Sequence, residues 1–110
     1  MSDTAKAAPA KTSANAWLAA AIDIGATAIR MDIAEISADG SIRTIESLRQ
    51  GVPLGKDSFT QGSISQATLR ECVKVLKGFR QVLQEYGITE PDRIRAVATS
   101  SVREAENRDT

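Results

Sequence analysis

The spacing of apolar and polar positions in the first half of the chain predicts β-strands. Trp17 to Ile24 is an almost unbroken apolar run, which is typical of a strand buried on both faces. Ala28 to Ile36 alternates instead, and alternation is typical of a strand with one buried face. Its apolar face carries Ile29, Met31 and Ile33, and its polar face carries Arg30 and Asp32.

A turn and a third strand follow the second run. Ala38-Asp39-Gly40-Ser41 predicts a two-residue type I′ hairpin turn, because Asp-Gly supplies the positive φ angles which that turn needs. Ile42 to Arg49 then predicts a third strand, and three antiparallel strands in succession make a meander. Gln50 to Gly62 is interrupted by glycines and a proline, so we expect a loop there.

Apolar residues at steps of three and four predict one long helix in the second half. Ser63-Ile64-Ser65-Gln66 has capping-box spacing, and Ser65 fits as the cap nearly as well as Ser63. Gly87 suits the end of the helix, with Pro91 just beyond it. The predicted core stripe consists of Leu69, Cys72, Val73, Leu76, Phe79, Leu83 and Tyr86. The charges on the other face indicate solvated surface: Arg70, Lys74, Lys77, Arg80 and Glu85.

The last part of the chain predicts a fourth strand over Arg93 to Ala98 and a second helix. The second helix would begin at Ser101-Val102-Arg103-Glu104, which has capping-box spacing. The element order is therefore β-β-β-α-β-α. Because a crossover helix returns the chain to a parallel strand, we expect the fourth strand to lie parallel to the first and beside it. Asp23-Gly25 and Thr99-Ser101 would then share the sheet edge where open α/β sheets bind ligands.

Composition removes several classes of function from this segment. The 14 basic and 14 acidic residues cancel, so overall charge gives no attraction to nucleic acid or to a membrane surface. The absence of histidine excludes a Ser-His-Asp triad and histidine-ligated zinc. A single cysteine, Cys72, excludes an internal disulfide and fits a reducing, cytoplasmic compartment; we expect it to be a small buried helix residue.

The first residues are expected to lie outside the folded domain. Residues 1–16 are rich in Ala, Ser, Thr and Lys and lack the hydrophobic stretch of a secretory signal, so they predict a disordered tail. No apolar run approaches the roughly 20 residues that span a bilayer. Residues 17–110 are the predicted domain.

The junction of the first two strands carries the first candidate site. Asp23 and Gly25 end the first apolar run, and the second run follows at once. Glycine lets a backbone approach a bulky anion closely, and a neighbouring carboxylate can hold a hydrated divalent cation. Gly25, Ala26 and Thr27 add backbone N–H groups and one hydroxyl. The turn therefore suggests a corner that binds phosphate and a metal ion.

The start of the second predicted helix is the other candidate. Its free N–H groups at Ser100 to Arg103 and the positive end of its dipole favour an anion. Arg103 in the first turn, and Arg30 on the polar face of the second strand, can each donate a charge-assisted bond to phosphate. Each feature also has an ordinary explanation, because Asp-x-Gly is a common tripeptide and Ser101 needs no role beyond capping.

Several segments together resemble the exopolyphosphatase / guanosine pentaphosphate phosphohydrolase (Ppx/GppA phosphatase) family. Ala21-Ile22-Asp23-Ile24-Gly25 with Ile29-Arg30 resembles its first phosphate motif, which the whole actin-like superfamily shares. Ala98 to Asn107 is more specific, with the pattern Ala-Thr-Ser-x-x-Arg-x-Ala-x-Asn. Similarity extends to Leu54-Gly55, Val75-Leu76-Lys77-Gly78-Phe79 and Glu85-Tyr86-Gly87.

The resemblance implies an α/β, ribonuclease H-like half-domain of the actin-like superfamily, truncated here. It implies Mg²⁺-dependent hydrolysis of the terminal phosphoanhydride of polyphosphate or guanosine pentaphosphate, in a protein that can form a homodimer. Asp23 would position the metal ion, and phosphate would be bound by Gly25, Ala26, Thr27, Arg30, Ser100 and Arg103. The general base and a second, glycine-rich phosphate motif are expected beyond residue 110, so this chain alone should be inactive.

One departure from the family pattern leaves alternatives open. The family typically has Ser-Asn-Ser where this chain has Ala26-Thr27-Ala28, which removes side-chain phosphate contacts. A family member that senses polyphosphate or guanosine tetraphosphate without turnover is therefore one alternative. A sugar or acetate kinase of the same superfamily is another, and Thr99 to Asn107 argues against it.

Overall fold

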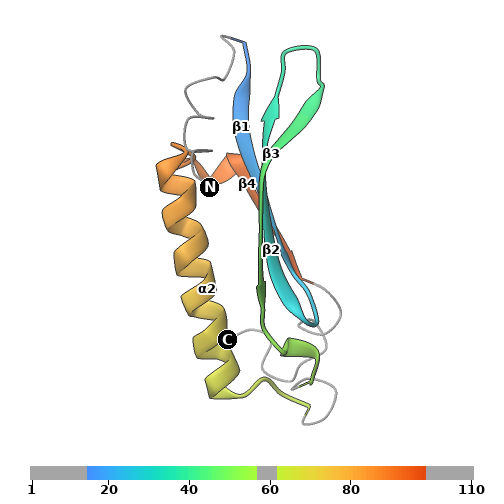
Figure 1. Ribbon diagram of the computed structural model, residues 1–110, viewed down its shortest axis with the longest axis vertical. Helices are drawn as coiled ribbons and strands as arrows, with labels where there is room; N and C mark the ends of the chain where they lie inside the picture. The colour runs from blue at the N-terminus through green and yellow to red at the C-terminus, as the bar shows by residue number, and fades with distance from the viewer. Residues whose placement is uncertain (1–14, 57–61, 99–110) are drawn as a thin grey trace.

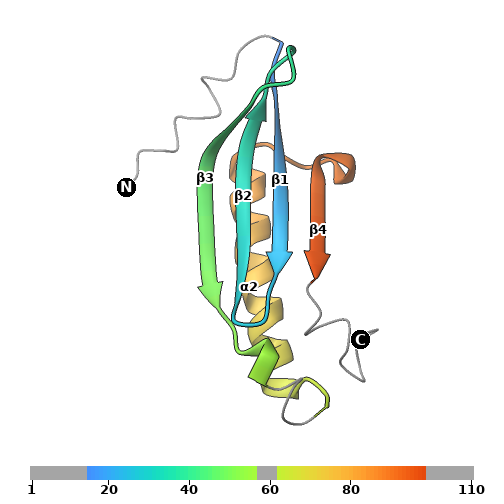
Figure 2. The ribbon, with the colours of Figure 1, turned by 90° about the vertical axis from the view of Figure 1, so that its right-hand side faces the viewer.

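The structure, a computed structural model, describes residues 15–56 and 62–98. Within these residues four strands form one sheet in the order β3-β2-β1-β4, with helix α2 across one face (Figures 1 and 2). The elements are β1 (Trp17–Ile24), β2 (Ala28–Ile36), β3 (Ile42–Gly51), α2 (Gln66–Glu85), the short 3₁₀ helix η2 (Pro91–Arg93) and β4 (Ile94–Ala98). β1 pairs antiparallel to β2 and parallel to β4, as the element order predicted.

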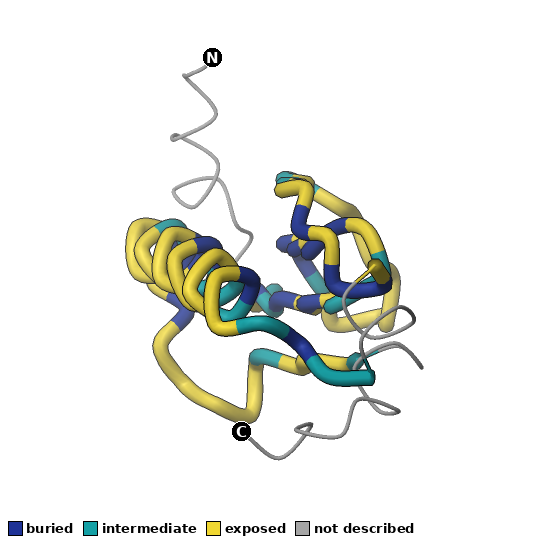
Figure 3. Tube along the Cα trace, turned by 90° about the horizontal axis from the view of Figure 1, so that it is seen from below, coloured by how far each residue is buried: buried dark blue, intermediate teal, exposed yellow. Residues whose placement is uncertain are grey.

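The core lies between α2 and the face of the sheet that β2 dominates. Ile29, Met31 and Ile33 are 0% exposed, which confirms the predicted apolar face of this strand. Burying a side chain of this size stabilises the fold by about 1.5–3 kcal/mol, so each of these three residues contributes substantially. Figure 3 shows that the outward side of α2 is exposed and that its buried positions lie on the opposite side.

β1 is not buried on both faces, contrary to the prediction from its apolar run. Leu18, Ala20 and Ile22 are buried, whereas Trp17, Ala21 and Asp23 are exposed. The difference arises because α2 covers only one side of the sheet within the described part of the chain. Small alanines on the other side keep the run apolar in sequence without providing a second core. We call this other side the open face of the sheet.

α2 presents a slightly different stripe to the core than its sequence predicted. Its buried residues are Thr68, Val75, Phe79 and Leu83, and Leu69, Cys72 and Leu76 are partly buried. Val73 is 50% exposed, so its place in the predicted stripe was wrong. Helix residues that are two positions apart point about 200° away from each other around the axis. Val73 and Val75 therefore cannot both face the core. The described helices include none that is long and apolar enough to span a membrane.

Both ends of α2 are closed by local hydrogen bonds. Ser65 is the N-cap, and its hydroxyl accepts a bond from the Thr68 N–H at 3.1 Å. At the other end Gly87, with φ at +77°, donates to the Gln84 carbonyl at 3.1 Å, and Ile88 donates to the Leu83 carbonyl at 2.9 Å. This is a Schellman motif, and it confirms the predicted role of Gly87.

The β2–β3 hairpin differs from the type I′ turn that Asp39-Gly40 predicted. Gly40 donates to the Ser37 carbonyl at 2.8 Å, and Ser37 donates to the Ser41 carbonyl at 2.9 Å. The loop therefore has three residues, with Gly40 alone left-handed at φ +87°. The Asp39 carboxylate accepts bonds from the Ser41 N–H at 2.9 Å and from the Ser41 hydroxyl at 2.7 Å, which lower the Asp39 pKa.

β3 is longer and less regular than predicted. It runs to Gly51 rather than ending at Arg49, so the predicted loop begins two residues later, and Leu54 to Lys56 within that predicted loop are helical. Its register with β2 shifts between Ile33 and Ala34, which leaves Ile45 as an extra residue in a β-bulge. β4 begins at Ile94, because η2 takes Arg93 out of the predicted strand. Residues 1–14, with most of the predicted tail, lie outside the described residues.

A part-buried side-chain bond joins the end of α2 to the bulged strand. The Tyr86 hydroxyl donates to Glu46 Oε1 at 2.6 Å, and Tyr86 is only 8% exposed. Burial raises the pKa of Tyr86 to about 12, and the bond to Glu46 adds to the shift. The phenol therefore stays protonated and donates at neutral pH.

Replacing Tyr86 with phenylalanine should lower the free energy of unfolding by about 1.5 kcal/mol at pH 7, since the Glu46 carboxylate loses a donor. Because the folded pKa lies above the ordinary value of 10.0, the stabilisation is complete below pH 10 and is lost as the pH rises toward 12. Urea denaturation of both proteins across this range measures the difference. A constant difference up to pH 12 would contradict the assignment.

Candidate functional site

The tightest turn of the sheet joins β1 to β2. The last strand pair is Ile24 with Ile29, and the Gly25 N–H then donates to the Ala28 carbonyl at 2.9 Å. Ala26 and Thr27 form the tip. Gly25 is not left-handed; an added Cβ would instead lie 3.2 Å from the Ala28 carbonyl oxygen. The glycine therefore allows a close backbone approach across the turn.

The segment that leaves β3 binds the carbonyl side of this turn. Val52 donates to the Thr27 carbonyl at 2.9 Å, and Gly55 donates to the Ala26 carbonyl at 2.6 Å. The side chains of Val52 and Leu54 are 1% and 2% exposed, so they anchor the segment in the core. We call Val52 to Gly55 the clamp segment.

The carbonyls of Ala26 and Thr27 are therefore occupied, whereas two N–H groups of the turn are available. The N–H groups of Ala26 and Thr27 have no acceptor among the described residues, and Thr27 is exposed. Successive free N–H groups at a turn make a partial positive charge that favours an anion. The backbone alone therefore offers two donors that suit an anion, without any side-chain charge.

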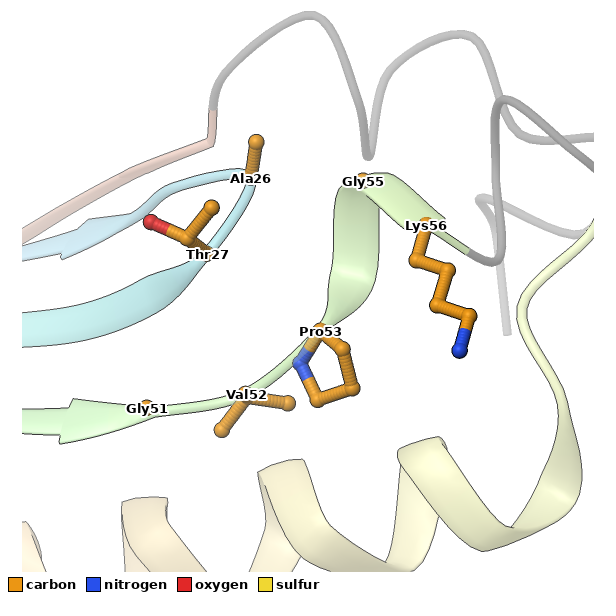
Figure 4. A pocket seen from close by; sticks show the side chains of 7 residues that line it. All are labelled: Ala26, Thr27, Gly51, Val52, Pro53, Gly55 and Lys56. Atoms are coloured by element: carbon orange, nitrogen blue, oxygen red, sulfur yellow. The ribbon is translucent and has the colours of Figure 1, made fainter.

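A hollow of about 610 Å³ lies between the turn and the clamp segment (Figure 4). Its lining residues are Ala26, Thr27, Gly51, Val52, Pro53, Gly55 and Lys56. Lys56 contributes the cation of this lining, and the sequence did not single it out. One sequence feature could have pointed to Lys56: it directly follows Leu54-Gly55, one of the segments on which the family resemblance rests.

Asp23 and Arg30 lie side by side on the open face of the sheet. They are register partners across β1 and β2, and both are exposed. Arg30 is in turn the register partner of Arg49 on β3, another cation that the sequence did not single out. The pairing of Arg30 with Arg49 depends on the bulged register of β3, and no local sequence pattern predicts that bulge.

The ends of β1 and β4, which were predicted to share one edge of the sheet, lie together as far as the structure describes them. Ile24 pairs with Ala98, so β1 and β4 end beside each other and point the same way. Asp23 has Val97 as its register partner in β4. Ser100 and Arg103 lie outside the described residues, so their predicted phosphate contacts stay predictions.

The two alanines that replace the family's serines face the protein. Ala28 is 6% exposed, and the Ala26 Cβ would lie 2.9 Å from a Cβ added to Gly55. Thr27, between them, is the exposed residue of the three at the tip. The hydroxyl that this chain keeps is therefore at the position open to a ligand.

The possible metal ligands of the corner suit an ion that is held mainly by the phosphates of a substrate. The described residues contain no group of three or more His, Cys, Asp or Glu side chains that could hold an ion. Asp23 supplies a single exposed carboxylate. Mg²⁺ keeps several waters and commonly binds through one or two carboxylates plus substrate phosphates, so Asp23 fits such an ion.

The fold and this corner define the chain as an α/β protein of the actin-like, ribonuclease H-like class. Residues 33–110 match the Ppx/GppA phosphatase family, and the chain belongs to that family. It is similar to the Ppx/GppA family member of Aquifex aeolicus, with 30% identity and a TM-score of 0.77 over 86% of this chain and 29% of that one.

Two further relatives extend the comparison. An exopolyphosphatase from Cytophaga hutchinsonii is 28% identical, with a TM-score of 0.75 over 84% of this chain and 28% of that one. The bifunctional 3-dehydroquinate synthase/phosphatase of Fusobacterium nucleatum is 31% identical over 103 residues, which cover 86% of this chain and 15% of that protein. The chain thus spans less than a third of each of these three relatives.

Proposed function

We propose that this chain is the N-terminal part of a Mg²⁺-dependent phosphoanhydride hydrolase. Its substrate would be inorganic polyphosphate or guanosine pentaphosphate, from which it releases the terminal phosphate in the cytoplasm. The observation that supports this most directly is the β1–β2 turn, whose carbonyls are bonded and whose N–H groups at Ala26 and Thr27 are available. Membership of a phosphatase family supports the reaction class.

Each residue of the corner has a distinct role in this proposal. The N–H groups of Ala26 and Thr27, with Gly25 and the Thr27 hydroxyl, bind phosphate oxygens. Arg30 adds positive charge from the open face, and Ser100 and Arg103 would add donors where β4 ends. Asp23 orients Mg²⁺ through coordinated water; bound Mg²⁺ neutralises phosphate charge and favours attack by water.

The general base belongs to the part of the enzyme beyond residue 110 in this proposal. The same division predicts that the substrate cleft, and the choice between polyphosphate and the guanosine nucleotide, depend on that second part. A homodimer of the complete enzyme is the assembly we propose.

The alternative hypothesis, a sensor that binds without turnover, loses part of its support. That alternative was based on the two missing serine hydroxyls, but Ala26 and Ala28 face the clamp segment and the core. Nothing in the corner favours a kinase over a hydrolase. Phosphate release by the complete protein distinguishes a hydrolase from a sensor directly.

Asp23→Ala should lower Mg²⁺-dependent phosphate release from polyphosphate by about a hundredfold in the complete enzyme, because about 2.7 kcal/mol of transition-state stabilisation is lost with the carboxylate. It should also raise the Mg²⁺ concentration needed for half-maximal rate. Asp32→Ala is the matched control, since Asp32 lies on the same open face and its carboxylate accepts a bond from the Ser47 hydroxyl at 2.6 Å. Undiminished turnover in Asp23→Ala would overturn the metal assignment.

Thr27→Val should weaken binding of tripolyphosphate to the complete enzyme by about tenfold, because one hydrogen bond to an anion is lost at nearly constant shape. Isothermal titration calorimetry measures the affinity. Thr44→Val provides the control, as an exposed threonine on β3 away from the turn. Equal affinities in the two variants would show that the Thr27 hydroxyl does not contact the anion.

The 110-residue chain by itself should release no phosphate from polyphosphate, because the proposed base is absent from it. A phosphate-release assay on the purified chain with Mg²⁺ tests this expectation. Measurable Mg²⁺-dependent release would place the base among these residues and contradict the proposed division of the site.

A further inference from the structure

The contact between Gly55 and Ala26 is the closest backbone approach in the candidate site. The Gly55 nitrogen lies 2.6 Å from the Ala26 carbonyl oxygen. A Cβ added to Gly55 would lie 2.9 Å from the Ala26 Cβ and 3.2 Å from its carbonyl oxygen. Optimal separations between non-bonded carbons are about 3.5–4.0 Å, so residue 55 has no room for a side chain.

This requirement for glycine is spatial rather than conformational. Gly55 is not among the glycines with positive φ, so its backbone suits any residue. Gly51, only four residues earlier, is different: a Cβ there would meet the Thr27 carbonyl oxygen at 3.8 Å, an ordinary contact. Of the two glycines that face the turn from β3 and the clamp segment, Gly55 is therefore the one that excludes a methyl group.

Neither partner can easily retreat from the contact. Leu54, directly before Gly55, is 2% exposed and holds the clamp segment in the core. Ala26 lies between Gly25, which bonds across the turn, and Thr27, whose carbonyl accepts from Val52 at 2.9 Å. A methyl group at residue 55 would therefore displace the tip of the turn.

The position of the Ala26 carbonyl determines the direction of a ligand-binding donor. The Ala26 C=O and the Thr27 N–H belong to one planar trans peptide group, in which they point in opposite directions. When the Gly55 N–H holds that carbonyl, the Thr27 N–H is aimed away from the clamp segment. Displacing the carbonyl rotates the whole peptide plane and misdirects the donor.

We propose that Gly55 is a positioning residue, which aims the Thr27 N–H at the bound anion by holding the Ala26 carbonyl, and that residues 55 and 26 are coupled in size. The identity of the anion as a phosphate group of the substrate rests on the proposed function. The positioning itself rests on the two distances and on the planarity of the peptide.

Four variants of the complete enzyme test the proposal: Gly55→Ala, Ala26→Gly, the double variant, and Gly51→Ala as the matched control. Gly55→Ala should lower kcat/KM for polyphosphate about tenfold, chiefly through KM, because the turn binds the ground state and the transition state alike. The double variant should recover to within about threefold of wild type, since the clash between the two methyl groups is gone. Gly51→Ala should stay within about twofold of wild type.

Amide hydrogen exchange provides a readout that does not depend on activity. In Gly55→Ala, the peptides that cover residues 25–28 and 51–56 should exchange faster than in wild type or Gly51→Ala, and the double variant should restore their protection. If the wild-type enzyme hydrolyses neither polyphosphate nor guanosine pentaphosphate, the proposed function fails, and this arm still decides the positioning role.

Three results would overturn the proposal. Gly55→Ala could match Gly51→Ala in both readouts, it could lose only thermal stability with KM unchanged, or Ala26→Gly could fail to rescue it. Ala26→Val crowds the same contact with Gly55 by enlarging the side chain of residue 26, and it should also raise KM. It therefore keeps the test decisive if Gly55→Ala does not fold.

Discussion

Burial of one face of β2 under α2 is the constraint on which the rest of this structure depends. Ile29, Met31 and Ile33 are fully buried, and slipping the strand by one residue would turn all three to the open face. Their burial therefore sets the β1–β2 register, which in turn places Asp23 beside Arg30. The geometry of the candidate site is thus a consequence of core packing along the same strand pair.

In the turn at the end of this pairing, the Ala26–Thr27 peptide group has its carbonyl bonded within the fold and its N–H free of any acceptor among the described residues. The carbonyls of Ala26 and Thr27 are bonded to the clamp segment, which belongs to the core through Val52 and Leu54. The N–H groups of Ala26 and Thr27 have no acceptor among the described residues. In the proposed function these donors are held by the fold before an anion arrives, so little ordering is required on binding. This arrangement also explains how alanine can stand at two positions where the family has serine.

Much of the fold could be predicted from local patterns. Periodicity, turn chemistry and chain connectivity predicted the strands Trp17–Ile24 and Ala28–Ile36, the Gly87 helix ending and the parallel place of the fourth strand. They left two serines open as the helix cap, and the structure has Ser65 there. The predictions failed where one sequence pattern was compatible with two structures. An apolar run rich in alanine does not reveal which face is covered, and Val73 and Val75 are equivalent until the core is known. Asp39-Gly40 fits two hairpin loops that differ by one residue.

The sequence by itself determined the four strands, the long helix, their order and the Asp23–Gly25 corner, because these depend on local periodicity, turn chemistry and the handedness of a crossover. Only the tertiary structure decided that Gly55 contacts Ala26, that Lys56 lines the same hollow, and that Arg49 is the register partner of Arg30. Those three relations join residues 19 to 30 positions apart. They depend on the bulged register of β3 and on burial of the clamp segment, which no window of neighbouring residues encodes.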